Sequence, residues 1–139
     1  FKGVDIYDDY AHHPTEIKEV IKGVKNGFKE KKIICIFQPH RVSRLNDLKK
    51  DFSSAFKKAQ SVILCPIYKA GENLSIKLDY YKFANLIAKK SNVDVFIVNN
   101  QCEIAKFLKN YLKPENIVIG MGAGSISNWI KQLPKLMKK

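Results

Sequence analysis

Arginine is scarce in this chain. Of its 25 basic residues only two, Arg41 and Arg44, are arginine, although the net charge is +12. Lysine cannot reproduce the planar, bidentate fork of a guanidinium group. The two arginines therefore indicate a site that recognises a carboxylate or a phosphate, rather than a general need for positive charge.

The chain also lacks the features of several protein classes. It has no apolar tract long enough to cross a bilayer and no segment with the pattern of a secretory signal peptide. Its three cysteines are odd in number and show no C-x-x-C spacing, which argues against a disulfide framework. We expect reduced, buried thiols, a cytoplasmic protein and no membrane association.

Phosphate-binding glycine motifs are missing as well. There is no G-x-x-x-x-G-K-[ST] sequence, so any ATP chemistry would need another domain. Gly120, Gly122 and Gly124 have G-x-G-x-G spacing, and no acidic residue can follow at the end of a later strand. We expect a tight turn there, which lets the last helix pack on the sheet.

Length and hydropathy patterning predict the fold. A chain of 139 residues with 45% hydrophobic residues is typical of one domain over residues 1–139, and its start at Phe1 directly before a strand indicates a piece of a longer protein. Apolar strand-like runs alternate five times with amphipathic patterns. The predicted strands cover 4–7, 32–37, 61–65, 93–98 and 116–121, and the predicted helices cover 14–27, a stretch from Leu45 to Ala59, 79–90, 101–112 and 126–133. This predicts an α/β fold, with a three-layer, mainly parallel, Rossmann-like sheet of five or six strands and helices on both faces.

The first polar motif, DDYAHHP, follows the first predicted strand. A carboxylate of Asp8 or Asp9 can accept the hydroxyls of a ribose, help to hold a divalent cation, or cap the next helix. Tyr10 and His12 can place two flat polar rings on one side of the turn, where they can stack on a base or donate to a substrate. The spacing is not a zinc signature, so we expect no protein-held metal.

The second motif, QPHRVSR, follows the second predicted strand. It contains His40, and Arg41 and Arg44 are spaced i and i+3, so on the first turn of a helix they can converge on one anion. A solvated basic turn is the alternative. Because the carboxyl ends of parallel strands meet at one edge, we expect both motifs to line one pocket for negatively charged reactants.

Most lysines are spread along the solvent sides of the predicted helices instead of forming one block with interleaved aromatics. This pattern predicts no nucleic-acid partner. A stand-alone basic module that binds nucleotides or nucleic acid is kept as an alternative.

Four segments together carry a family resemblance. They are DDYAHHPTE at 8–16, FQPHRVSR at 37–44, IYKAGE at 67–72 and GAGSI at 122–126. In this order, over essentially the whole chain, they resemble the carboxy-terminal domain of the Mur ligases, and above all of the members that add L-alanine to UDP-N-acetylmuramate. The resemblance implies a bacterial, three-domain, ATP-dependent amide ligase of peptidoglycan synthesis, whose upstream domains hold the UDP-sugar and, mainly, ATP with Mg²⁺.

The resemblance also implies roles for individual residues. In these ligases ATP phosphorylates the muramoyl carboxylate, and the alanine amine attacks the acyl phosphate. Asp9, Tyr10 and His12 would contact the nucleotide. The substrate-binding residues would be Tyr10, His12, His40, Arg41 and Arg44, of which the last three would be catalytic. A related ligase that attaches a recycled tripeptide to the same sugar shares the first motif, whereas the Gln-Pro-His-Arg run favours the alanine enzyme. Alone, the chain is expected to be inactive.

Overall fold

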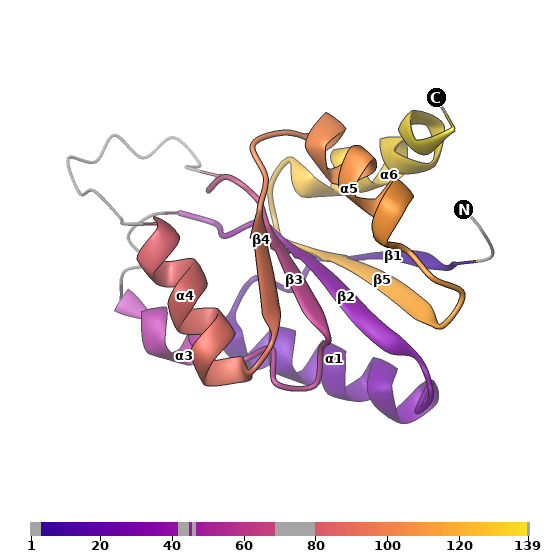
Figure 1. Cartoon of the computed structure of the whole chain (residues 1–139). Coiled ribbons are helices and arrows are strands. Elements are labelled where there is room, and N and C mark those ends of the chain that lie inside the picture. The colour runs from indigo at the N-terminus through magenta and orange to yellow at the C-terminus, as the bar shows by residue number, and fades with distance from the viewer. Residues whose placement is uncertain (1–3, 42–44, 46, 69–79, 139) are drawn as a thin grey trace.

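A computed structural model describes residues 4–41, 45, 47–68 and 80–138 of the chain (Figure 1). In chain order the elements are β1 (Ile6–Asp9), α1 (Pro14–Gly27), β2 (Lys32–Phe37), α3 (Lys49–Ser53), β3 (Ser61–Leu64), α4 (Tyr80–Ser91), β4 (Asp94–Ile97), α5 (Gln101–Tyr111), β5 (Asn116–Met121) and α6 (Ile126–Met137). The strands of these described segments form one parallel sheet in the order β1-β5-β2-β3-β4. The predicted α/β class and parallel sheet are confirmed.

Helices cover both faces of the sheet. Helices α1, α3 and α4 lie against one face, and α5 and α6 lie against the other (Figure 1). The core on the first face includes Ile21, Phe52 and Phe83, and the core on the second includes Leu108 and Ile130. This is the three-layer arrangement that the alternation of apolar strands and amphipathic helices predicts.

The two central strands are buried on both faces. From Ile33 to Phe37 in β2, and throughout β5, each residue is buried. This explains why both segments appear in the sequence as uninterrupted apolar runs. A Cβ on Gly120 would lie 2.5 Å from the side chain of Ile130, so glycine lets α6 pack directly on β5. The close packing predicted for the last helix is therefore confirmed.

Helix α3 is shorter than predicted. The expected helix continued through Phe56 to Ala59, but α3 ends at Ser53. The cause lies in α4, where the Oγ of Ser91 donates to the carbonyl oxygen of Ser53 at 2.6 Å and accepts from the N–H of Phe56 at 3.2 Å. Ser53 also bonds back through its own Oγ to the carbonyl of Lys49 at 2.6 Å. These bonds satisfy the backbone groups that a longer helix would have used.

The remaining elements agree with the prediction to within one to four residues, and α1, β2 and β5 have the predicted bounds. Helix α6 continues beyond the predicted Leu133, through Pro134, to the buried Met137. Within the described residues no helix is both long and apolar enough to span a bilayer. The expectation of buried thiols is confirmed for Cys35 and Cys65, whereas Cys102 is exposed.

Candidate functional site

Four loops meet at the carboxyl edge of the sheet. They follow β1, β2, β3 and β5 and contain residues 10–13, 38–41, 65–68 and 122–125. Because all these strands run in parallel, their loops emerge on the same side. The ring centroids of His12 and His40 lie 5.7 Å apart, which confirms that the two sequence motifs come together at this edge.

Four side-chain rings cross this edge in a row. Tyr10 and His12 have ring centroids 5.6 Å apart, His12 and His40 are 5.7 Å apart, and His40 stacks on Tyr68 at 5.5 Å with an angle of 24° between the planes. The two ends are open, because Tyr10 is 70% and Tyr68 is 40% exposed. We call Tyr10, His12, His40 and Tyr68 the ring row. Its flat polar faces suit stacking on a base.

The loop after β1 is fixed by local hydrogen bonds. One carboxylate oxygen of Asp9, Oδ1, accepts the N–H of Ala11 at 2.9 Å, as in an Asx turn. The Nδ1 of His12 lies 2.9 Å from the carbonyl oxygen of Tyr10 and must donate to it, which makes Nε2 the acceptor of the neutral ring. Asp8 accepts a hydrogen bond from the hydroxyl of Ser127 and so joins β1 to α6. Asp8 thus has a structural contact, and Asp9 stays the predicted ribose ligand.

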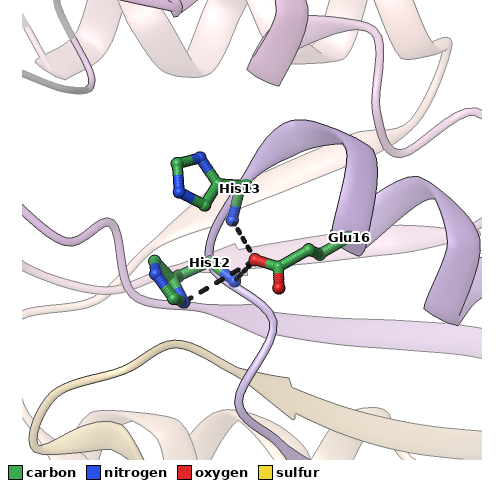
Figure 2. Close-up of side chains that lie close together, drawn as sticks. All are labelled: His12, His13 and Glu16. Atoms are coloured by element: carbon green, nitrogen blue, oxygen red, sulfur yellow. Dashed lines mark hydrogen bonds and ion pairs between the residues drawn. The ribbon is translucent and has the colours of Figure 1, made fainter.

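Glu16 holds the beginning of α1. Its Oε1 accepts the N–H of His13 at 3.1 Å and that of His12 at 3.4 Å (Figure 2). The hydrogen bond from His13 is the main cause that lowers the pKa of Glu16 below its ordinary value of 4.5. Pro14 occupies the first helical turn, as predicted. Together these residues cap the helix.

His12, His13 and Glu16 are also the group within the described segments whose donor atoms could hold a metal ion. These atoms lie within 4.8 Å of one another, and the Nδ1 of His12 lies 3.8 Å from the Oε1 of Glu16. The oxygen of Glu16 that faces the loop already accepts two backbone N–H groups. Helix capping therefore accounts for the arrangement in Figure 2.

Arg41, in the loop after β2, does not have helical backbone geometry. Arg41 has a φ of 69°, in the left-handed region, and its carbonyl oxygen accepts the N–H of Leu45 at 3.3 Å. The expected position of Arg41 on a helical turn is therefore wrong. Its side chain is exposed. Arg44 lies outside the described residues, and so does the 69–72 part of the IYKAGE segment.

Gln38 links the loop after β2 to the loop after β5. The side chain is only 3% exposed, and its Nε2 donates to the Oγ of Ser125 at 3.0 Å. Its Oε1 accepts the N–H of Ile126, the first residue of α6, at 3.0 Å. The sequence reasoning did not assign Gln38 a role. The signal was present, because an amide side chain directly follows the apolar run from Ile33 to Phe37.

Glycine allows the loop after β5 to lie close to its neighbours. Gly122 has a φ of 153°, and a Cβ there would meet the carbonyl oxygen of Gln38 at 3.0 Å. A Cβ on Gly124 would lie 2.4 Å from the ring of Tyr68. Tyr68 belongs to the IYKAGE segment, but the sequence does not predict it as a site residue, because its contact with His40 depends on how β2 and β3 pair.

A cavity of about 710 Å³ lies beside the first loop, between α1 and the region of α3. His13, Glu16, Glu19 and Asp51 are among the residues that line it. Three carboxylates against one lysine, Lys18, disfavour an anionic ligand in this cavity. The ring row and Arg41 are therefore better candidates than this cavity for binding the anionic reactants that the sequence predicts.

Comparison with known proteins relates the chain to one family. The family model described as "Mur ligase, glutamate ligase domain" matches residues 1–124. A UDP-N-acetylmuramate--L-alanine ligase from Pelagibacter ubique (strain HTCC1062) is 57% identical over 133 residues, which make up 96% of this chain and 29% of that protein. The chain therefore spans less than a third of this relative's length.

Solved structures share the fold. A UDP-N-acetylmuramate-alanine ligase from Thermotoga maritima matches with a TM-score of 0.71 and 24% identity, over 96% of this chain and 27% of that one. A domain from a Haemophilus ducreyi protein, described as a UDP-N-acetylmuramate:L-alanyl-gamma-D-glutamyl-diaminopimelate ligase, matches with a TM-score of 0.71 and 16% identity, over 98% of this chain and 93% of that one. At these identities the likeness concerns the fold alone.

Proposed function

This chain belongs to the Mur ligase family, and on that premise we propose that it is the carboxy-terminal domain of an ATP-dependent ligase that joins L-alanine to UDP-N-acetylmuramate. The observation that carries the proposal is the 57% identity to the Pelagibacter ubique relative of that name, which extends over 96% of the chain. Residues 1–139 would form one domain. The amino-terminal and central domains of the same protein would hold the UDP-sugar and the triphosphate.

The reaction proceeds through an acyl phosphate. An oxygen of the muramoyl carboxylate attacks the γ-phosphorus of ATP, and ADP leaves. The nitrogen of alanine then attacks the acyl carbon, phosphate leaves with the bonding electrons, and the nitrogen gives up a proton. The protein must therefore orient a nucleotide, an acyl phosphate and the carboxylate of alanine.

In this proposal the loop after β1 faces the nucleotide. Asp9 accepts from the ribose hydroxyls, and the rings of Tyr10 and His12 border the nucleotide and the amino acid. This is supported by the fixed turn and by the exposed face of Tyr10, which is 70% accessible. The hydrogen bond from His12 Nδ1 to the carbonyl of Tyr10 leaves Nε2 to accept from a ligand.

The loop after β2 faces the anionic reactants. His40, Arg41 and Arg44 orient alanine and the acyl phosphate, because a guanidinium fork binds a carboxylate or phosphate bidentately. The observation in favour is the position of His40 within the ring row, with the exposed Arg41 next to it.

ATP and Mg²⁺ would be held mainly outside this chain. The sequence has no P-loop. Mg²⁺ prefers oxygen ligands in octahedral geometry, and among the described residues the candidate metal group offers one carboxylate, which already caps α1. We therefore assign Mg²⁺ mainly to the upstream domains of the protein. ATP and UDP-sugars are cytoplasmic metabolites, which supports a cytoplasmic location.

The related tripeptide ligase is the second candidate. Structures of both kinds of ligase match with the same TM-score of 0.71, so the fold does not distinguish them. The 57% identity favours alanine. The test is ADP release by the full-length protein with UDP-N-acetylmuramate and either L-alanine or the L-alanyl-γ-D-glutamyl-diaminopimelate tripeptide. Release that depends on the tripeptide and not on alanine would refute the first proposal.

Arg41→Lys tests the role of the guanidinium. Lysine keeps the positive charge and has backbone conformational preferences similar to those of arginine, but it lacks the bidentate guanidinium fork. We therefore expect kcat/KM for L-alanine to fall by about tenfold or more. The control is Lys22→Arg, an exposed change on α1 that should leave kcat/KM unaltered. Equal activity of Arg41→Lys and the parent enzyme would contradict the assignment.

A further inference from the structure

Tyr68 is an exposed aromatic residue in a fixed place. Its side chain is 40% exposed, so burial in the core does not explain its orientation. Three contacts do explain it: the stack on His40, two backbone hydrogen bonds to the loop after β2, and the close approach of Gly124. These contacts join the loops after β2, β3 and β5.

The backbone of Tyr68 holds the peptide on both sides of His40. The N–H of Tyr68 donates to the carbonyl oxygen of Pro39 at 2.9 Å, and the N–H of Arg41 donates to the carbonyl oxygen of Tyr68 at 2.7 Å. This is a parallel bridge between His40 and Tyr68, separate from the ladders of the sheet. It puts the two side chains on the same side, where their rings stack. The bond to Tyr68 also supports Arg41 in its left-handed conformation, which a residue other than glycine adopts at a cost.

The side chain of Tyr68 lies directly against Gly124. A Cβ on Gly124 would lie 2.4 Å from its Cγ, 2.7 Å from its Cδ1 and 2.8 Å from its Cβ. Real Cβ atoms do not approach other atoms so closely, so an alanine at 124 must displace the ring or the turn. The absence of a side chain at Gly124 thus leaves the space in which the ring of Tyr68 lies, and that ring stacks on His40.

We propose that Tyr68, seated against Gly124, is a positioning residue that fixes the ring of His40 and the turn at Arg41 for the anionic reactants. This inference rests on the proposed ligase function for its kinetic consequences, but the stacking that it invokes can be measured without activity. It adds Tyr68 and Gly124 to the residues on which the site depends.

The first experiment observes the stack directly in the 139-residue chain. Proton–carbon NMR spectra resolve the ring signals of the three histidines, and replacing each histidine in turn assigns them. Tyr68→Leu should move the His40 ring signals towards those of an unstacked imidazole, because the ring current of the tyrosine is lost. Tyr68→Phe should leave them in place. If Tyr68→Leu folds and the His40 signals do not move, the proposal is overturned.

The second experiment measures activity of the full-length ligase. Tyr68→Leu and Gly124→Ala should each lower kcat/KM for L-alanine about two- to tenfold, the effect of an aromatic pair on alignment. Tyr68→Phe should restore parent activity, since it keeps the ring. Combining Gly124→Ala with Tyr68→Leu should cost no more than either change alone, because the added methyl group acts through the ring.

Gly23→Ala is the matched control. Gly23 lies on the exposed side of α1, where an added Cβ meets nothing within 4 Å, so activity should be unchanged. If Gly124→Ala leaves kcat/KM within the error of this control, Gly124 has no positioning role and the proposal is overturned. Fully additive losses in the double variant would overturn it as well. If the unmutated full-length enzyme shows no alanine-dependent ADP release, the proposed function is refuted. The NMR result would still show whether Tyr68 stacks on His40.

Discussion

Replacing Gln38 by methionine should destabilise the domain strongly, although the two side chains have nearly equal volumes. The side chain is 3% exposed and makes two hydrogen bonds, as donor to Ser125 and as acceptor from the N–H of Ile126. Methionine can make neither bond. The N–H of Ile126 would then be buried at the beginning of α6 without an acceptor.

The magnitude follows from these contacts. Each lost hydrogen bond contributes about 1 kcal/mol net, and an orphaned buried N–H costs about 1–3 kcal/mol. The hydroxyl of Ser125 is half-buried, so water can replace its lost donor at a small cost. We therefore expect Gln38→Met to lower the free energy of unfolding by about 2–4 kcal/mol, and Ser125→Ala to lower it by about 1 kcal/mol.

The assay is urea unfolding of the 139-residue chain, followed by far-UV circular dichroism at constant pH and salt. The control is Gln132→Met, the same substitution at an exposed position of α6, which should change the free energy of unfolding by less than about 0.5 kcal/mol. A Gln38→Met protein with the stability of this control and an unchanged m-value would refute the claim that Gln38 holds the helix.

Two further predictions concern titration and thiol chemistry. Because the pKa of Glu16 is lowered in the folded state, its ionised form adds stability above pH 4.5, and this is lost as the pH falls through the folded value. Glu16→Gln should therefore lose less stability between pH 7 and pH 3 than the parent or the Glu19→Gln control, as urea midpoints would show. Burial raises the pKa of Cys65 to about 12, and it raises that of Cys35 further. At pH 8 iodoacetamide should modify Cys102 alone in the folded protein, and mass spectrometry showing early labelling of Cys35 would contradict this.

The strands and the first helix could be predicted because local signals and burial agree. Pro14 and Glu16 mark the beginning of α1, and the unbroken apolar runs of β2 and β5 follow from burial on both faces. Helix α3 could not be predicted in length. Its end depends on Ser91, which is distant in sequence and competes for the backbone groups of Ser53 and Phe56.

The site could be predicted only in part, because some of its features follow from the sheet topology and others depend on tertiary contacts. A parallel sheet brings the ends of β1 and β2 to one edge, so the sequence could predict that His12 and His40 approach each other. It could not predict the conformation of Arg41, because its φ of 69° is supported by Tyr68, whose pairing with this loop is a tertiary contact. The tie from Gln38 to Ile126 also depends on strand order.

Strand order also makes the glycines after β5 part of the site. Strand β5 lies between β1 and β2, so the two loops that carry His12 and His40 start about 10 Å apart, two strand spacings. Their rings nevertheless come within 5.7 Å, so both side chains lean across the end of β5. The loop after β5 must therefore leave space for these two rings. Gly122 allows this, because without a Cβ its backbone can pack closely against the carbonyl oxygen of Gln38. The glycine-rich turn, which has no dinucleotide spacing, thus serves the site through the space that it leaves open.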